Sequence, residues 1–142
     1  MNILQIGILV FVLIETMNIV TLYFYPGSKK GNGIGVFNSF HRVQEQDKDF
    51  VYYLIYWVAG TKLIFIMLGV VIVVFGNYQT QLYTVLAFII SILSFYWKLY
   101  PIIRKLDNKG DISPTGYSKG LFLMILGMIL GFLAVFVTAL IY

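Results

Sequence analysis

The segment that decides the fold reads GLFLMILGMILGFLAVFVTALIY over residues 120–142, and it contains no charged side chain. At about 1.5 Å of rise per residue, a helix of this length crosses the roughly 30 Å hydrocarbon core of a bilayer. An apolar segment this long requires lipid around it, so we predict a transmembrane helix over residues 119–142.

The rest of the chain has the same character. Of its 142 residues, 60% are hydrophobic and only 11% are charged, which is more apolar surface than a soluble domain of this size can bury. We therefore predict one all-α integral membrane domain over residues 1–142, a four-helix transmembrane bundle that is multi-pass in the cell membrane, with the lipid bilayer as its first partner. The three further transmembrane helices are predicted over residues 3–25, 50–75 and 82–100.

Proline, glycine and serine mark the predicted helix ends. Pro26 and Pro101 each follow a tyrosine, and because proline lacks an amide hydrogen we expect the first and third helices to end there. Gly76-Asn77 breaks the second helix and leaves a short connection, which predicts a tight antiparallel hairpin with the third. Ser113 or Ser118 is expected to cap the fourth helix.

The ends of the first and third helices also resemble each other. One reads Tyr25-Pro26-x-x-Lys29-Lys30 and the other Tyr100-Pro101-x-x-Arg104-Lys105. This similarity could record duplication of a two-helix hairpin. The preferred interpretation is that any inward helix can end in an aromatic residue, a proline and basic residues, and duplication stays open as the alternative.

The basic residues predict the orientation. Nine of the ten Lys and Arg side chains lie in or beside residues 26–49 and 101–118, and the N-terminus, the second loop and the C-terminus carry none. The positive-inside rule places these two loops in the cytoplasm and both chain ends outside. The same rule accounts for the net charge of +4, and we expect no nucleic-acid partner. The nine residues are Lys29, Lys30, Arg42, Lys48, Lys98, Arg104, Lys105, Lys109 and Lys119.

Two charges fall inside the predicted membrane span. Glu15 lies roughly 15 Å from the cytoplasmic end of the first helix, and Lys62 lies roughly 18 Å from the cytoplasmic start of the second. Each charge alone would cost on the order of 3 kcal/mol at the bilayer centre. Since the two helices are consecutive, we predict that Glu15 and Lys62 form a pair or share a polar interior.

Two further polar residues are candidates for the same interior. Asn18 follows Glu15 by three residues and lies on the same helix face, and Ser91 of the third helix lies at a similar depth. One interpretation is a mid-membrane site for an ion, a proton or a substrate. The other is a structural ion pair that only fixes the helix register.

The first cytoplasmic loop is rich in glycine and lysine. Residues 26–35 read PGSKKGNGIG, and glycines let successive amides point at an anion. The candidate contacts to an anion or a lipid headgroup are Lys29, Lys30, Gly31, Gly33 and Arg42. The order of a Walker A or dinucleotide fingerprint is absent. A flexible turn with topology-setting lysines is the alternative.

The fourth helix carries a motif for close packing. Gly127-x-x-x-Gly131 lies in an apolar segment and lets two helix backbones approach closely, within the bundle or between protomers. We therefore expect the protein to form a homo-oligomer or to join a hetero-complex.

Three functions remain after the exclusions. The chain has no cysteine and a single histidine, His41, and we expect no metal site and no cofactor. The first hypothesis is a transport or channel component that uses Glu15, Asn18, Lys62 and Ser91. The second is an accessory or assembly subunit of a larger membrane complex. The third is an interfacial membrane enzyme acting on a lipid-like substrate. It ranks last because we find no candidate catalytic residues and no nucleophile–base pair.

Overall fold

The computed structural model describes residues 1–26 and 44–141, and every regular element within them is helical. These elements are α1 (Ile3–Phe24), α2 (Glu45–Phe75), α3 (Tyr78–Leu93), the short 3-10 helix η3 (Ser94–Tyr96), α4 (Leu99–Asn108) and α5 (Tyr117–Ile141).

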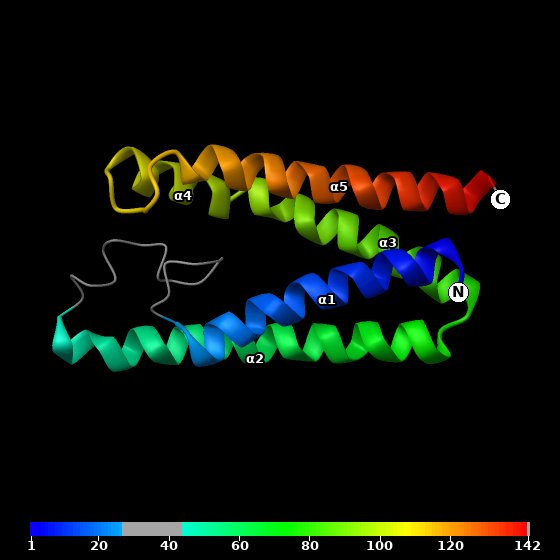
Figure 1. Ribbon diagram of the computed structural model, residues 1–142, viewed down its shortest axis with the longest axis horizontal. Helices are drawn as coiled ribbons and strands as arrows, with labels where there is room; N and C mark the ends of the chain where they lie inside the picture. Colours follow the sequence, from blue (N-terminus) through cyan, green and yellow to red (C-terminus); the bar gives the residue numbers. More distant parts are fainter. Residues whose placement is uncertain (27–43, 142) are drawn as a thin grey trace.

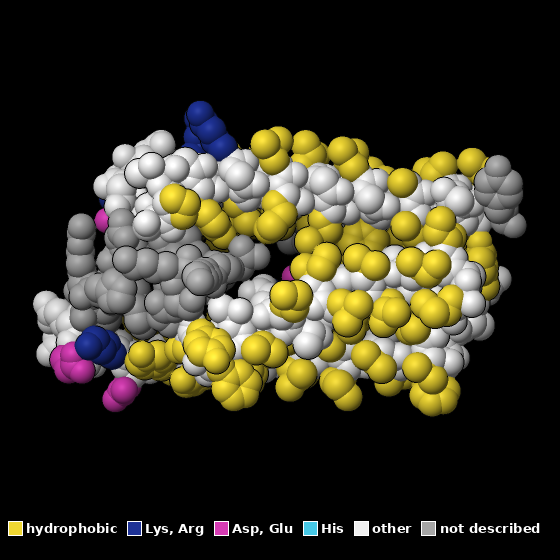
Figure 2. Space-filling view, viewed as in Figure 1, with side chains coloured by type: hydrophobic (Ala, Val, Ile, Leu, Met, Phe, Trp, Pro, Cys, Tyr) yellow, Lys and Arg dark blue, Asp and Glu magenta, His cyan; other side chains and the backbone are white. Residues whose placement is uncertain are grey.

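Four helical stretches in these ranges are long and apolar enough to cross a membrane: Ile3–Phe24, Glu45–Phe75, Tyr78–Asn108 and Tyr117–Ile141. At most 22% of the most apolar window of each stretch is buried inside the protein. Figure 2 shows hydrophobic side chains covering the outer surface of the helices, while charged ones gather at one end. Such a surface needs lipid around it, which supports a multi-pass membrane protein.

The long helices run alternately up and down (Figure 1). The N-terminus and the C-terminal end of α5 lie at one end of the molecule. The start of α2 and the whole of α4 lie at the other end. All Lys and Arg residues of the described ranges except Lys62 lie at or near the α4 end.

Helix α1 occupies the centre of the arrangement. It packs along α2 on one side and against α3 and α5 on the other, while α3 and α5 also pack on each other. Three aromatic rings join α1, α3 and α5 in the core: Phe11 and Phe88 lie 4.5 Å apart between ring centroids, and each lies 5.7 Å from Phe132. Burial of these rings stabilises the junction.

Two helices begin earlier than the sequence indicates. Helix α2 starts at Glu45, five residues before the expected position, and Glu45 and Asp47 occupy its first turn, where the helix dipole favours negative charge. Helix α3 starts at Tyr78, with the Asn77 side chain accepting a hydrogen bond from the Thr80 amide at 2.9 Å. Only Gly76 and Asn77 separate α2 from α3.

The expectation that Pro101 ends the third helix is wrong. Helix α3 ends at Leu93, eight residues earlier, and Pro101 is the third residue of α4. A proline in the first turn of a helix removes only an amide that would have no acceptor within the helix, so it starts a helix as readily as it ends one. Pro26, by contrast, does follow the end of α1. The two Tyr-Pro pairs therefore have different structural roles, and the hairpin duplication stays a prediction.

Candidate functional site

The candidate site lies in the seam between α1 and α2, which follows a regular spacing of three and four residues. This spacing keeps one face of each helix turned toward its neighbour. Glu15 and Lys62 occupy central positions in two stripes that are otherwise apolar. The α1 stripe is Leu4, Ile8, Val12, Glu15, Ile19 and Leu22, and the α2 stripe is Ile55, Ala59, Lys62, Ile66 and Gly69.

The structure brings Glu15 and Lys62 into direct contact. The Lys62 ammonium nitrogen Nζ lies 2.7 Å from Glu15 Oε2, an ion pair and hydrogen bond between consecutive helices. The Asn18 amide nitrogen Nδ2 lies 3.4 Å from the same oxygen. One carboxylate oxygen therefore takes both contacts.

The pair is not sealed from its surroundings. The Glu15 side chain remains 19% exposed and that of Lys62 34% exposed. One further polar atom of the cluster is fully buried. Asn18 Oδ1 has no hydrogen-bond partner within residues 1–26 and 44–141. A buried acceptor without a donor lowers stability, so the cluster has capacity for one further donor.

Ser91 does not join this cluster in the described structure. It is exposed on α3, two residues beyond the buried Ile89 and hence on a different helix face. Neighbouring hydroxyls bond back to their own helix, with Thr84 Oγ1 donating to the Thr80 carbonyl at 2.7 Å and Ser94 Oγ donating to the Ser91 carbonyl at 2.6 Å.

The candidate anion contacts in the first loop lie outside the described residues. They are Lys29, Lys30, Gly31, Gly33 and Arg42.

A second polar cluster, which the sequence did not predict, closes the end of the molecule that holds both chain termini. Gln81 of α3 is 1% exposed, and its Nε2 donates to the Gly76 carbonyl at 2.8 Å. Its Oε1 accepts from Asn2 Nδ2 at 2.8 Å, and Gln5 Nε2 donates to the Val73 carbonyl at 3.0 Å. These amides satisfy carbonyls that the C-terminus of α2 leaves free. The only sequence signal was the presence of glutamines at the ends of two apolar segments.

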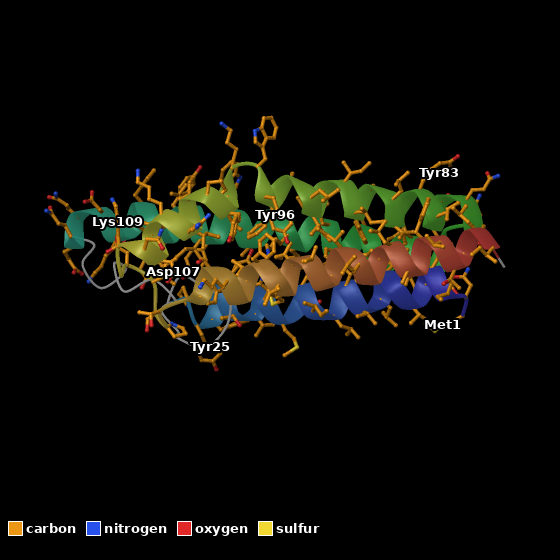
Figure 3. All side chains as sticks on the ribbon, turned by 90° about the horizontal axis from the view of Figure 1, so that it is seen from above. Met1, Tyr25, Tyr83, Tyr96, Asp107 and Lys109 are labelled. Atoms are coloured by element: carbon orange, nitrogen blue, oxygen red, sulfur yellow. The ribbon has the colours of Figure 1, made fainter. Side chains whose placement is uncertain are left out.

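A third polar cluster fixes the start of α5, and here the predicted caps are replaced. The Asp107 carboxylate of α4 accepts hydrogen bonds from the Gly116 and Ser118 amides, each at 2.9 Å, and from the Ser118 hydroxyl at 2.5 Å. Ser118 is therefore a donor to the cap, and the acceptor is a carboxylate from the preceding helix. Figure 3 shows Asp107 and Lys109 near the same end as Tyr25, opposite Met1 and Tyr83.

The fold and this site together define a class, that of small multi-pass α-helical membrane proteins with a charged pair between two of their apolar helices. Comparison with known proteins adds no relative: no family model, curated protein or solved structure matches the chain.

Proposed function

We propose that the protein is a transport or channel component in which Glu15, Lys62 and Asn18 form the polar site that a transported species contacts. The observation that supports this proposal is the incomplete enclosure of a charged pair at the centre of an apolar seam. A pair that only fixed the register of two helices would gain most from complete hydrogen bonding of its polar atoms, and Asn18 Oδ1 has no such partner among the described residues.

The chemistry of the cluster favours exchange of ligands at Glu15. Lys62 Nζ and Asn18 Nδ2 both contact Oε2, so an arriving cation or proton would compete with them for one carboxylate. Lys62 then acts as a tethered counter-ion that neutralises Glu15 while no cation or proton is bound. Asn18 Oδ1 offers an additional acceptor beside it.

The test is a flux measurement in proteoliposomes containing the purified protein, with proton- and alkali-cation-sensitive dyes inside. We expect a flux above that of empty vesicles, abolished by Glu15→Gln, which keeps the side-chain size and removes the charge. Thr16→Val is the matched control, since the Thr16 hydroxyl donates to the Val12 carbonyl of its own helix and lies outside the pair. Equal flux for wild type and Glu15→Gln would refute the proposal.

One observation favours a second candidate, an accessory or assembly subunit. A Cβ atom built on Gly120, Gly127 or Gly131 of α5 meets no atom within 4 Å, so there is open space at these three positions among the described residues. Small residues allow another helix to approach closely, from a second copy or from a different polypeptide. Native mass spectrometry after gentle detergent extraction separates the two candidates. A homo-oligomer favours the transport or channel proposal, and a second polypeptide at fixed stoichiometry favours the accessory subunit.

A further inference from the structure

Helix α4 has two faces of opposite chemistry, and the basic side chains of the outer face do not take part in its packing on α5. The inner face holds the buried Ile103, which packs in a cluster with Leu106, Tyr117 and Leu121. The inner face also directs Asp107, the only acidic residue of α4, onto the amides at the start of α5. The carboxylate of α4 is thus occupied and turned away from the outer face.

The outer face is a shallow basic depression of about 440 Å³. Its lining consists of Tyr100, Pro101, Arg104, Lys105, Asn108 and Lys109. These residues provide three cations, an amide and a phenol, and no carboxylate is part of the lining. An amphipathic helix places its charged side chains opposite its apolar face, and here Asp107 is drawn to the inner face, so the cations of the outer face lie beside hydrogen-bond donors with no carboxylate of α4 among them.

The depression also has a fixed wall. The Tyr100 ring lies 6.0 Å from that of Phe95, 5.9 Å from that of Tyr96 and 5.3 Å from that of Phe122 of α5, measured between ring centroids. These aromatic contacts hold Tyr100 in place, so this side of the depression is fixed, while the basic side chains that extend beside it keep their own rotamer freedom.

The exposed side of α4 changes in polarity along its length. Leu99 and Ile102 in its first turn are 53% and 55% exposed, and Arg104, Lys105 and Lys109 follow. This order, at the end of the apolar helix α3, is typical of a segment that passes from the acyl region of a bilayer into the headgroup region.

We propose that the outer face of α4 is a binding site for a phosphate group, and its position at the end of an apolar segment points to the headgroup of an acidic phospholipid as the source. The Arg104 guanidinium offers paired donors that match two phosphate oxygens, and Lys105 and Lys109 add charge. This site is separate from the Glu15–Lys62 pair.

The experiment measures retention of added lipid by native mass spectrometry of the purified full-length protein. The probes are phosphatidylglycerol and phosphatidylcholine with identical acyl chains, and glycerol phosphate as a soluble phosphate ester. The test variant is Arg104→Gln/Lys105→Gln/Lys109→Gln. The control, Lys48→Gln/Lys98→Gln/Lys119→Gln, removes the same charge at positions outside the depression. Circular dichroism confirms that each variant keeps its helicity.

We expect wild type and control to prefer phosphatidylglycerol over phosphatidylcholine, and the test variant to bind phosphatidylglycerol about tenfold more weakly. Arg104→Lys keeps the charge and is the substitution that disturbs the fold least. A partial loss of phosphatidylglycerol affinity in this variant would support recognition of two phosphate oxygens by the guanidinium.

Three results would overturn the proposal. The wild type could show no preference for phosphatidylglycerol. The test and control variants could lose affinity equally, which would mean that only overall charge matters. Glycerol phosphate could bind as strongly as phosphatidylglycerol, which would make a soluble ester, and not a lipid, the source of the phosphate.

Discussion

At the residue scale, the Glu15–Lys62 contact makes it possible for two charged side chains to lie within an apolar helix seam. A lone charge in a membrane helix costs on the order of 3 kcal/mol, and the 2.7 Å contact offsets much of the cost for both residues.

Removing one partner of this pair should therefore lower the free energy of unfolding more than removing both partners does. We expect Lys62→Met to lower the free energy of unfolding by about 2 kcal/mol, because Glu15 loses its counter-ion inside the bundle. The double variant Glu15→Gln/Lys62→Met should regain at least half of that loss. The measurement is a double-mutant cycle of unfolding in mixed detergent micelles. Strict additivity of the two single changes would show that the pair makes no energetic contribution.

At the element scale, α1 and α2 approach closely because one position in the seam has no side chain. A Cβ atom added to Gly69 of α2 would lie 2.8 Å from Val12 Cγ2 of α1, and valine is stiff about its first side-chain torsion. A Cβ atom added to Gly127 of α5, by contrast, would have no other atom within 4 Å.

This difference yields a matched pair of substitutions. Gly69→Ala should destabilise the protein by about 1–2 kcal/mol, since the seam must open to accommodate the methyl group. Gly127→Ala should leave the unfolding free energy unchanged or raise it by roughly 0.5 kcal/mol, because alanine is the better helix former. Thermal unfolding of the two variants under identical detergent conditions provides the comparison. A larger loss for Gly127→Ala would mean that this glycine packs against another chain.

The position of α4 relative to the start of α5 also depends on contacts between elements. Asp107 supplies three acceptor contacts to the first residues of α5, so Asp107→Asn should cost about 1 kcal/mol and raise amide exchange at Gly116 and Ser118. Hydrogen exchange with mass spectrometry measures both effects. Asp49→Asn, an exposed acid in α2, is the control, and equal exchange in the two variants would argue against the cap.

At the scale of the whole molecule, the up-and-down order of the helices places the α2–α3 turn and the α4–α5 connection at opposite ends. Because the chain contains no cysteine, single cysteines report on each end without background. Gln79 and Thr115 are both exposed and lie in these two connections or beside them.

The positive-inside rule predicts which of these two single-cysteine variants is labelled from outside the cell. A membrane-impermeant maleimide should label Gln79→Cys in intact cells, and should label Thr115→Cys only after permeabilisation. The labelled fraction is read by mass shift on a gel. The opposite pattern would invert the orientation, and it would place the basic face of α4 outside the cytoplasm.

Sequence reasoning predicted the helices well because their signal is local. A run of about 20 apolar residues needs lipid whatever it packs against, so the four apolar spans were found, although several of their ends were misplaced by more than a helical turn. Depth along a helix is also local, which is why Glu15 and Lys62 could be matched. Ser91 was matched by depth alone, and depth does not specify the helix face that points inward.

The sequence by itself determined that this is a membrane protein with four apolar spans, since hydropathy is a property of each segment. Only the tertiary structure decided the rest: the Lys62–Glu15 contact, the burial of Gln81 against the end of α2, the cap that Asp107 provides to α5, and the place of Pro101 inside α4. Each of these depends on which helix faces meet. In a chain whose segments are apolar on every side, periodicity gives almost no information about that choice.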